Sequence, residues 1–224
     1  DVASSVDLPI IIKIGGVEAI SDIYNAITLG VSGIIAPMAE TKFAVSKFTN
    51  AIETFVAEDN REDIEFAFNV ETITGYKNLD EILSLNNLNV LSGVTIGRVD
   101  FTASMDKDRN FVDSEDMLKY CTEIFTKSKS KGLKCGLGGA ISSNSASFIK
   151  TLVSQNLIDK YETRKIVYDK NAINSDKPIT NIELLNFAID NHIEYTKTTK
   201  TKVIDNNGNV IGILGIGRDF TVEQ

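Results

Sequence analysis

The chain has 224 residues, 42% of them hydrophobic and 24% charged, which is enough to bury a sizeable core in one soluble domain with a small extension. Its net charge of −8 and pI near 4.8 argue against nucleic acid as a main partner, because phosphate binding requires a basic surface. No apolar run approaches the roughly 20 residues of a membrane span, and no signal-peptide pattern is visible. A cytoplasmic protein without membrane contact is therefore expected. Cys121 and Cys135 lack a metal-ligand spacing and are interpreted as reduced structural thiols.

Short apolar runs alternate with helical patterns along most of the chain. Strands are predicted at 10–14, 33–38, 64–68, 94–97, 133–137 and 164–168. Helices are predicted at 17–27, 41–55, 78–85, 113–129 and 145–153. Alternating strands and helices with short connections imply a parallel sheet covered by helices. This pattern alone does not choose between a (β/α) barrel and an open doubly wound sheet.

The last fifty residues follow a different pattern. An amphipathic helix is predicted at 178–195, where Ile182, Leu185, Ile189 and Ile193 share one face. The segment 202–214 has the pattern of a hairpin around an Asn-Gly turn. The run 207–221 resembles the closing strand of a PAS sensor domain, but a PAS core does not fit here, so an appended hairpin is expected. The sole histidine, His192, is interpreted as a surface residue.

Two acidic residues follow successive strand-like runs. Glu71 comes directly after the run 68–70, and Asp100 ends the run 94–100. Carboxylates at the C-terminal ends of neighbouring parallel strands meet on one rim, where α/β barrels build their active sites. Hard cations such as Mg²⁺ or Mn²⁺ prefer oxygen donors and often take only one or two protein carboxylates. The two residues are therefore candidate metal ligands; the alternative is that each caps the helix that follows.

Four sequence blocks carry a resemblance to a known family. They are IKIGG at 12–16, IAPM at 35–38, NVET at 69–72 with NLDEI at 78–82, and IGRVDFTAS at 96–104. In order and spacing they resemble the HpcH/HpaI aldolase and citrate lyase β-subunit family over about residues 8–170. The resemblance implies that Glu71 and Asp100 hold a divalent metal ion, Mg²⁺ or Mn²⁺.

The resemblance also implies roles for other residues. Family members usually carry arginine where this chain has Lys13, which supplies charge but not bidentate geometry. Arg98 stands where many members have proline, and it is hypothesised to supply the missing bidentate group. Lys13 and Arg98 are thus the candidate catalytic residues, and Gly15, Met38, Gly97 and Arg98 the candidate substrate-binding residues. A solvated Lys13 and a plain turn at Gly15 remain alternatives.

The resemblance implies a TIM (β/α) barrel of the phosphoenolpyruvate/pyruvate type. About six of the eight family strands are visible, so an incomplete barrel is expected at 1–173, followed by a helix and hairpin extension at 174–224. The implied activity is that of a class II pyruvate aldolase, a metal-dependent carbon–carbon lyase acting on a small 2-oxo or hydroxy acid, in a homo-oligomer. A citrate-lyase-like acyl-CoA lyase and a non-catalytic metabolite-binding or assembly module remain alternatives.

Overall fold

A computed structural model describes residues 9–163, 166–174, 201–204 and 210–214. The strands are β1 (Ile11–Lys13), β2 (Gly33–Ala36), β3 (Glu65–Val70), β4 (Gly93–Gly97), β5 (Lys134–Gly138), β6 (Lys160–Glu162), β7 (Val167–Asp169), β8 (Thr201–Ile204) and β9 (Val210–Leu214). The α-helices are α1 (Ile20–Thr28), α2 (Lys42–Phe55), α3 (Glu58–Asp63), α4 (Ile73–Lys77), α5 (Leu79–Ile82), α6 (Arg98–Ala103), α7 (Glu115–Lys129) and α8 (Ala146–Ser154). The short 3-10 helices are η2 (Leu88–Val90), η3 (Arg109–Asp113), η4 (Ser143–Ser145) and η5 (Lys170–Asn174).

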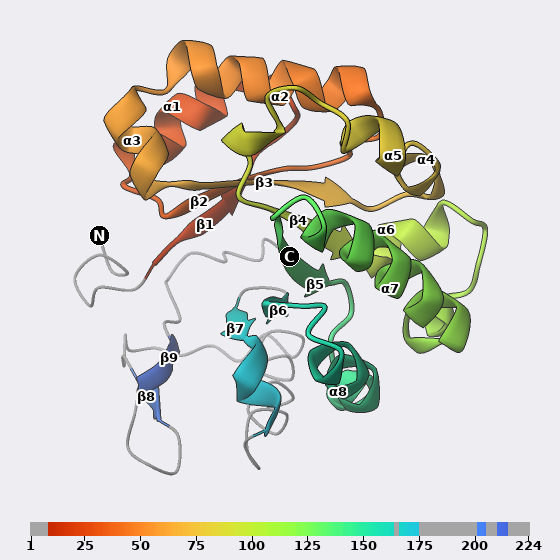
Figure 1. The fold of residues 1–224 in the computed structure, drawn as a ribbon. Coiled ribbons are helices and arrows are strands. Elements are labelled where there is room, and N and C mark those ends of the chain that lie inside the picture. The colour runs from red at the N-terminus through yellow and green to blue at the C-terminus, as the bar shows by residue number, and fades with distance from the viewer. Residues whose placement is uncertain (1–8, 164–165, 175–200, 205–209, 215–224) are drawn as a thin grey trace, which may run out of the picture.

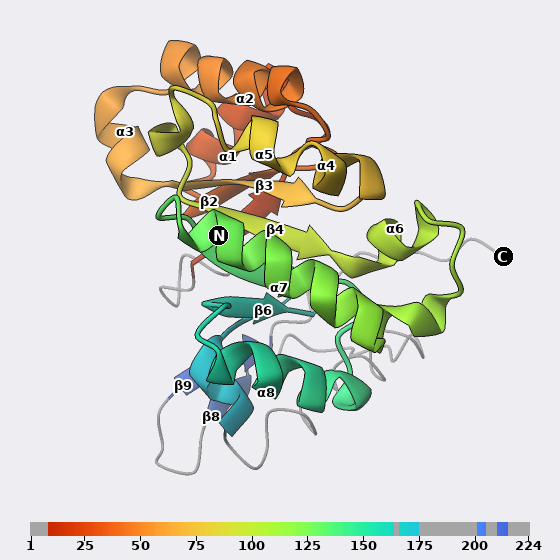
Figure 2. The same ribbon diagram turned by 45° about the vertical axis from the view of Figure 1, so that its right-hand side comes forward.

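Strands β1 to β7 form one curled sheet in chain order. Neighbours from β1 to β6 are parallel, and β7 is antiparallel to β6. The helices lie on the outer side of the curve, with α1 and α2 over the first strands, α7 beside β4 and β5, and α8 near β6 (Figures 1 and 2). The sheet is therefore an open half-barrel, which confirms the predicted incomplete α/β barrel.

The two faces of the sheet differ in composition because side chains alternate along each strand. The outward side chains are apolar and fully or almost fully buried in the core under the helices; they include Ile34, Phe66, Phe68, Val94, Ile96, Cys135, Leu137 and Tyr161. The opposite face, here called the inner face, carries the apolar Ile35 and Ala67 beside many glycines and polar or charged residues: Lys13, Asn69, Thr95, Gly97, Gly136, Gly138, Lys160 and Glu162. Apolar burial against the helices thus fixes which residues point inward.

Strand register arranges the inner face in rows across the sheet. Asn69 is paired with Thr95, Thr95 with Gly136, and Gly136 with Lys160. In the next row, Gly97 is paired with Gly138 at the C-terminal ends of β4 and β5. Glu71 follows β3 by one residue, so it borders this second row and lies at the rim where the C-terminal ends of parallel strands meet.

Three elements differ from the sequence prediction. The sixth parallel strand is β6, which was not predicted, whereas the described part of the predicted strand 164–168 belongs largely to β7 and runs back. The Thr163 N–H donates to the Ile166 carbonyl at 2.9 Å, which joins the chain just after β6 to the chain just before β7. The run 94–100 leaves the strand at Gly97 and continues as α6. The predicted helix 78–85 is the shorter α5, and α4, which was not predicted, precedes it.

The C-terminal strands β8 and β9 pair in antiparallel fashion. This confirms the predicted hairpin, although its Asn-Gly turn lies outside the described residues. The predicted helix 178–195 and His192 also lie outside the described residues.

Candidate functional site

Glu71 is the most buried acidic residue at the C-terminal rim, with 2% of its surface exposed. Its Oε1 accepts from the Met38 backbone N–H at 2.9 Å, and its Oε2 accepts from the Asn69 side-chain amide at 3.1 Å. The Lys13 ammonium lies 3.2 Å from Oε2 and 3.5 Å from Oε1. Because a buried carboxylate is costly without such partners, the structure holds Glu71 in one position.

Lys13 ends β1 and reaches across β2 to Glu71. Its side chain is 51% exposed, so the ammonium faces both the buried carboxylate and the open inner side of the sheet. A half-exposed cation of this kind can neutralise Glu71 and still contact an anionic ligand from solvent. The sequence prediction had Lys13 as a cation at this rim but could not show its partner.

Gly97 is required by the close approach of Glu71. A Cβ atom at Gly97 would lie 2.7 Å from Glu71 Oε2 and 2.9 Å from Glu71 Cβ. Both distances are below van der Waals contact, and the Cβ of Glu71 cannot rotate away. Gly97 therefore shapes the space around the carboxylate, and no direct contact with a ligand is needed to explain the glycine.

We expect Gly97→Ala to displace the Glu71 carboxylate from its present hydrogen bonds. The expected loss of activity at this site is roughly 10²-fold, the size associated with misplacing a catalytic group by about 1 Å. Gly16→Ala is the matched control, since a Cβ atom there meets nothing within 4 Å. Steady-state assays of both variants check this, and equal activity of Gly97→Ala and the parent would contradict it.

Asp100 lies in the first turn of α6, directly beyond the end of β4. Its side chain is exposed. The strand before it, β4, is the neighbour of β3, which leads to Glu71. Both predicted metal ligands thus follow adjacent parallel strands, as the sequence pattern implied.

The donor set around Glu71 fits a hard cation. Asn69 Oδ1 is buried and has no hydrogen-bond partner among the described residues, so it adds a neutral oxygen beside the Glu71 carboxylate. Within the described ranges, no group of three or more His, Cys, Asp or Glu residues could hold a metal ion. Mg²⁺ does not require such a group, since it usually keeps several waters beside one or two carboxylates.

Arg98 has a structural role in place of the substrate-binding role hypothesised from the sequence. Its guanidinium is completely buried. It donates to five acceptors: Gly138 O at 3.1 Å, Val112 O at 2.9 Å, Asp113 Oδ1 at 2.6 Å, Gly139 O at 2.8 Å and Ser145 Oγ at 3.5 Å. All five guanidinium N–H groups are thereby used. Arg98 fixes the loop after β5 and has no donor left for a substrate carboxylate.

Gly15 and Met38 occupy loops at the rim. The Gly15 N–H donates to Asp22 Oδ2 at 2.7 Å, which ties the loop after β1 to α1 and supports the turn alternative for Gly15. Met38 has a φ of +49°, a left-handed conformation that non-glycine residues rarely adopt. This conformation accompanies the hydrogen bond from its N–H to Glu71, and its side chain remains 48% exposed at the rim.

Sequence reasoning missed Asn69 and Glu162 as members of this site. Asn69 was quoted only as part of a motif, yet its amide binds Glu71 directly. Glu162 ends β6, and its side chain lies over Gly138, beside the row that contains Gly97. The signal was available in the alternation Lys160, Tyr161, Glu162, in which the outward tyrosine places both charged residues inside.

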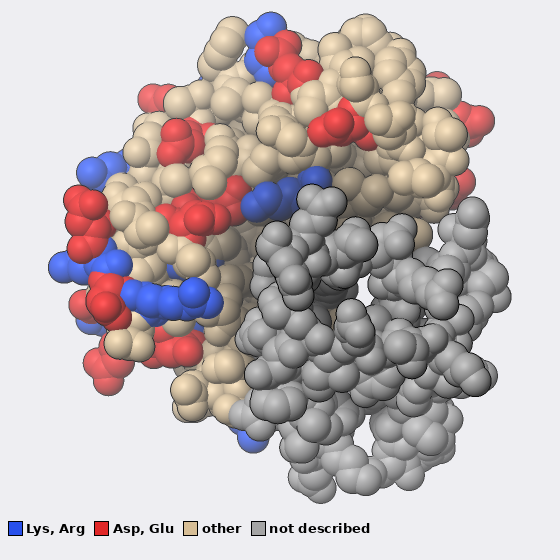
Figure 3. All heavy atoms as spheres, turned by 180° about the vertical axis from the view of Figure 1, so that it is seen from behind, with Lys and Arg blue, Asp and Glu red and all other residues tan. Residues whose placement is uncertain are grey.

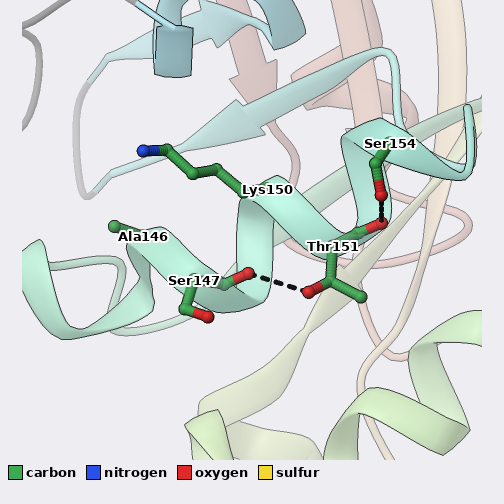
Figure 4. A pocket seen from close by; sticks show the side chains of 5 residues that line it. All are labelled: Ala146, Ser147, Lys150, Thr151 and Ser154. Carbon is green, nitrogen blue, oxygen red and sulfur yellow. Dashed lines mark hydrogen bonds between the residues drawn. The ribbon is translucent and has the colours of Figure 1, made fainter.

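A surface depression of 450 Å³ on α8 is separate from this rim. It is lined by Ala146, Ser147, Lys150, Thr151 and Ser154. The Thr151 hydroxyl donates to the Ser147 carbonyl at 3.0 Å, and the Ser154 hydroxyl donates to the Thr151 carbonyl at 2.8 Å (Figure 4). Since these hydroxyl protons serve the helix itself, the depression offers little polar chemistry.

The surface seen from behind carries both signs of charge. Lysine and arginine side chains lie among aspartate and glutamate side chains over the coloured part of Figure 3. No extended single-sign patch is visible on that face of the described residues.

Among the described helices none has both the length and the apolar character needed to cross a bilayer.

Comparisons with known proteins bear on the fold and family. One similar solved structure is the citrate synthase SbnG, with a TM-score of 0.59 at 15% identity, covering 86% of this chain and 76% of that chain. Another is an HpcH/HpaI aldolase from Desulfitobacterium hafniense DCB-2, with a TM-score of 0.58 at 10% identity, covering 84% and 75%. A third is macrophomate synthase, with a TM-score of 0.54 at 17% identity, covering 73% and 61%. At these identities the likeness establishes the fold.

Comparison with protein-family models agrees with the fold found by structural comparison. No curated protein matches the sequence. The PAS resemblance of the C-terminal run is not borne out, because the matching family model lies elsewhere in the chain. That model describes the HpcH/HpaI aldolase/citrate lyase family and matches residues 11–144, more than half of the 224 residues. The chain therefore belongs to the HpcH/HpaI aldolase/citrate lyase family.

Proposed function

We propose that this protein is a divalent-metal-dependent carbon–carbon lyase that cleaves or forms a bond next to a pyruvate enolate. The observation that carries the proposal is the buried Glu71 carboxylate at the C-terminal rim, held beside the half-exposed cation Lys13 and above Gly97. Family membership supports a lyase or aldolase in general terms. The site supports a small 2-oxo acid as substrate, because it pairs an oxygen-donor set with a cation.

In this proposal Glu71 and Asp100 hold Mg²⁺ or Mn²⁺. Such an ion, when bound, supplies a Lewis acid that stabilises negative charge on the oxygen of the 2-oxo group. Lys13 contacts the substrate carboxylate or the developing enolate oxygen, where a fixed positive charge favours the transition state. The backbone N–H of Met38 and the amide of Asn69 keep the Glu71 carboxylate oriented during this chemistry.

We expect Lys13→Met to lower kcat/KM for cleavage by a factor on the order of 10² to 10³, as loss of one charge-stabilising donor does elsewhere. Methionine retains most of the apolar stem, and the lysine is half-exposed. We therefore expect the free energy of unfolding to change much less than kcat/KM does. Lys47→Met, which removes a lysine from the surface pair with Glu18, is the matched control. Activity of Lys13→Met within about twofold of the parent would assign Lys13 to solvent.

The proposed function is tested by pyruvate release from a panel of 4-hydroxy-2-oxo acids with Mn²⁺. We expect release that is abolished by a chelator and restored by added Mn²⁺. In parallel, a panel of 3-hydroxyacyl-CoA thioesters is assayed for cleavage. Activity on the thioesters alone would favour an acyl-CoA lyase, and binding of 2-oxo acids without turnover or metal would favour a non-catalytic module.

A further inference from the structure

A second carboxylate reaches the same row of the inner face from the other side. A Cβ atom at Gly138 would lie 2.7 Å from Glu162 Oε1, 3.1 Å from its Cγ and 3.3 Å from its Cδ. The Glu162 carboxylate therefore lies over Gly138 as the Glu71 carboxylate lies over Gly97. The two glycines are paired across β4 and β5.

This arrangement limits the distance between the two carboxylates. Paired residues on neighbouring strands are separated by about 4.8 Å, and each carboxylate has an oxygen within 2.7 Å of the Cβ position of its glycine. The nearest oxygens of Glu71 and Glu162 are therefore no more than about 10 Å apart on the same face. Because neither glycine has a side chain, both carboxylates can lie close to the sheet on the same face, where a ligand at the rim can meet both.

Glu162 differs from the other acidic residues of the inner face in its partners. Glu71 is paired with Lys13, and Glu65 is paired with Lys134 and, at 3.2 Å, with Lys160. The Glu162 carboxylate, by contrast, forms no hydrogen bond or ion pair with the residues that the structure describes. Lys160 and Lys13, whose charges act on Glu162, are themselves paired with Glu65 and Glu71.

The surroundings of Glu162 favour a carboxyl that can carry a proton. Burial raises the pKa of Glu162 above its ordinary value, and the Glu71 carboxylate acts in the same direction. The charges of Lys160 and Lys13 oppose this rise without cancelling it. A raised pKa makes the carboxylate a stronger base and brings its titration closer to neutral pH, as general catalysis requires. The sole histidine, His192, lies outside the described residues.

We propose that Glu162 is the proton-transfer residue of the site: it accepts the hydroxyl proton of a 4-hydroxy-2-oxo acid and returns it to the enolate carbon. This inference rests on the proposed function. As the proton leaves the hydroxyl, the aldehyde carbonyl forms, the carbon–carbon bond breaks, and its electron pair becomes the enolate. Protonated Glu162 then gives the proton to the enolate carbon, which becomes the methyl group of pyruvate, and the carboxylate is regenerated.

Glu162→Gln tests the proposal through three reactions of the full chain with Mn²⁺. We expect pyruvate release from 4-hydroxy-2-oxopentanoate to fall by a factor on the order of 10² to 10⁴, the usual contribution of a general acid–base. Deuterium exchange into the methyl group of pyruvate should fall similarly. Loss of CO₂ from oxaloacetate should be largely retained, because it yields the same enolate without removal of a hydroxyl proton.

The pH profile gives a readout that a merely structural role would not change. Glu162 must be ionised to accept the proton, so kcat/KM of the parent should decline as the pH falls through the raised pKa. This acidic limb should be absent from Glu162→Gln. Added formate should partly restore exchange in Glu162→Ala by replacing the missing carboxylate. Glu53→Gln, an exposed position on α2, is the control.

Gly138→Ala provides an independent variant that keeps Glu162. The atoms nearest to the new Cβ belong to the Glu162 side chain, whose far end can rotate, so the fold is expected to be retained. We expect cleavage and exchange to fall at least tenfold, with little further loss when Gly138→Ala is added to Glu162→Gln. This variant also serves if Glu162→Gln fails to fold.

The outcomes separate the inference from the proposed function. A parent protein that neither cleaves the substrate nor exchanges pyruvate protons would overturn both. An active parent with Glu162→Gln within threefold of it, or with all three reactions equally reduced and the acidic limb unchanged, would overturn the role of Glu162 alone.

Discussion

Glu71→Gln is expected to remove most of the carbon–carbon lyase activity, lowering kcat by a factor on the order of 10³. Glutamine keeps the size of the side chain and can still accept from the Met38 N–H, but it removes the negative charge that Lys13 and the proposed cation share. A metal ion supplies several kcal/mol of transition-state stabilisation, and each 1.4 kcal/mol corresponds to about tenfold in rate.

Two measurements separate this effect from misfolding. Mn²⁺ binding, followed by electron paramagnetic resonance, should be present in the parent and lost in Glu71→Gln, while the unfolding midpoint in urea should change little. Glu18→Gln is the matched control, since Glu18 forms only a surface pair with Lys47. Retained Mn²⁺ affinity in Glu71→Gln would show that Glu71 is not a ligand.

Arg98→Met is expected to cause the largest loss of stability of any single change considered for this protein. The substitution would leave the Asp113 carboxylate without its cation and the Gly138, Val112 and Gly139 carbonyls without a donor. Breaking a buried ion pair by removing one partner costs about 3–5 kcal/mol. The side chain is completely buried and packs 4.9 Å from the Phe148 ring centre, so water cannot replace the lost donors.

Urea unfolding of Arg98→Met, Arg98→Lys and the parent measures this cost. The unfolding midpoint of Arg98→Lys should lie between those of Arg98→Met and the parent. Lysine keeps the positive charge, but its ammonium has three N–H donors, whereas the planar guanidinium has five. Arg109→Lys on η3 is exposed and should be neutral. A parent-like unfolding midpoint for Arg98→Met together with raised KM would restore the hypothesis that Arg98 binds the substrate.

The first five strands were predicted within a few residues because their sequence signal is local. Each is a short, mainly apolar run in a segment bounded by turn or charged residues, and its outward side chains pack under the helices. β6 and β7 were predicted less well. They are only three residues long. Two of the three residues of β6, Lys160 and Glu162, are charged, so this segment lacks the apolar signal by which the other strands were predicted.

The sequence also placed the acidic rim correctly in the chain. A carboxylate after each of two successive predicted strands, Glu71 and Asp100, requires only that the strands be parallel and adjacent, and β3 and β4 are. The sequence did not predict the partners of Glu71. Lys13 lies 58 residues away in sequence and Met38 lies 33 residues away, and neither contact follows from local pattern.

The sequence by itself determined the parallel sheet covered by helices and the rim on which acidic residues gather, because apolar periodicity and strand ends are local features of short segments. The family blocks in the same sequence then selected the incomplete barrel over an open doubly wound sheet. Only the tertiary structure decided what each charged side chain does there. Arg98 and Lys13 are both cations near that rim, yet folding surrounds Arg98 with five acceptors and leaves Lys13 half-exposed beside Glu71. The physical reason is that burial and hydrogen-bond partners come from residues brought together across the sheet, and these determine whether a charge supports the fold or meets a ligand.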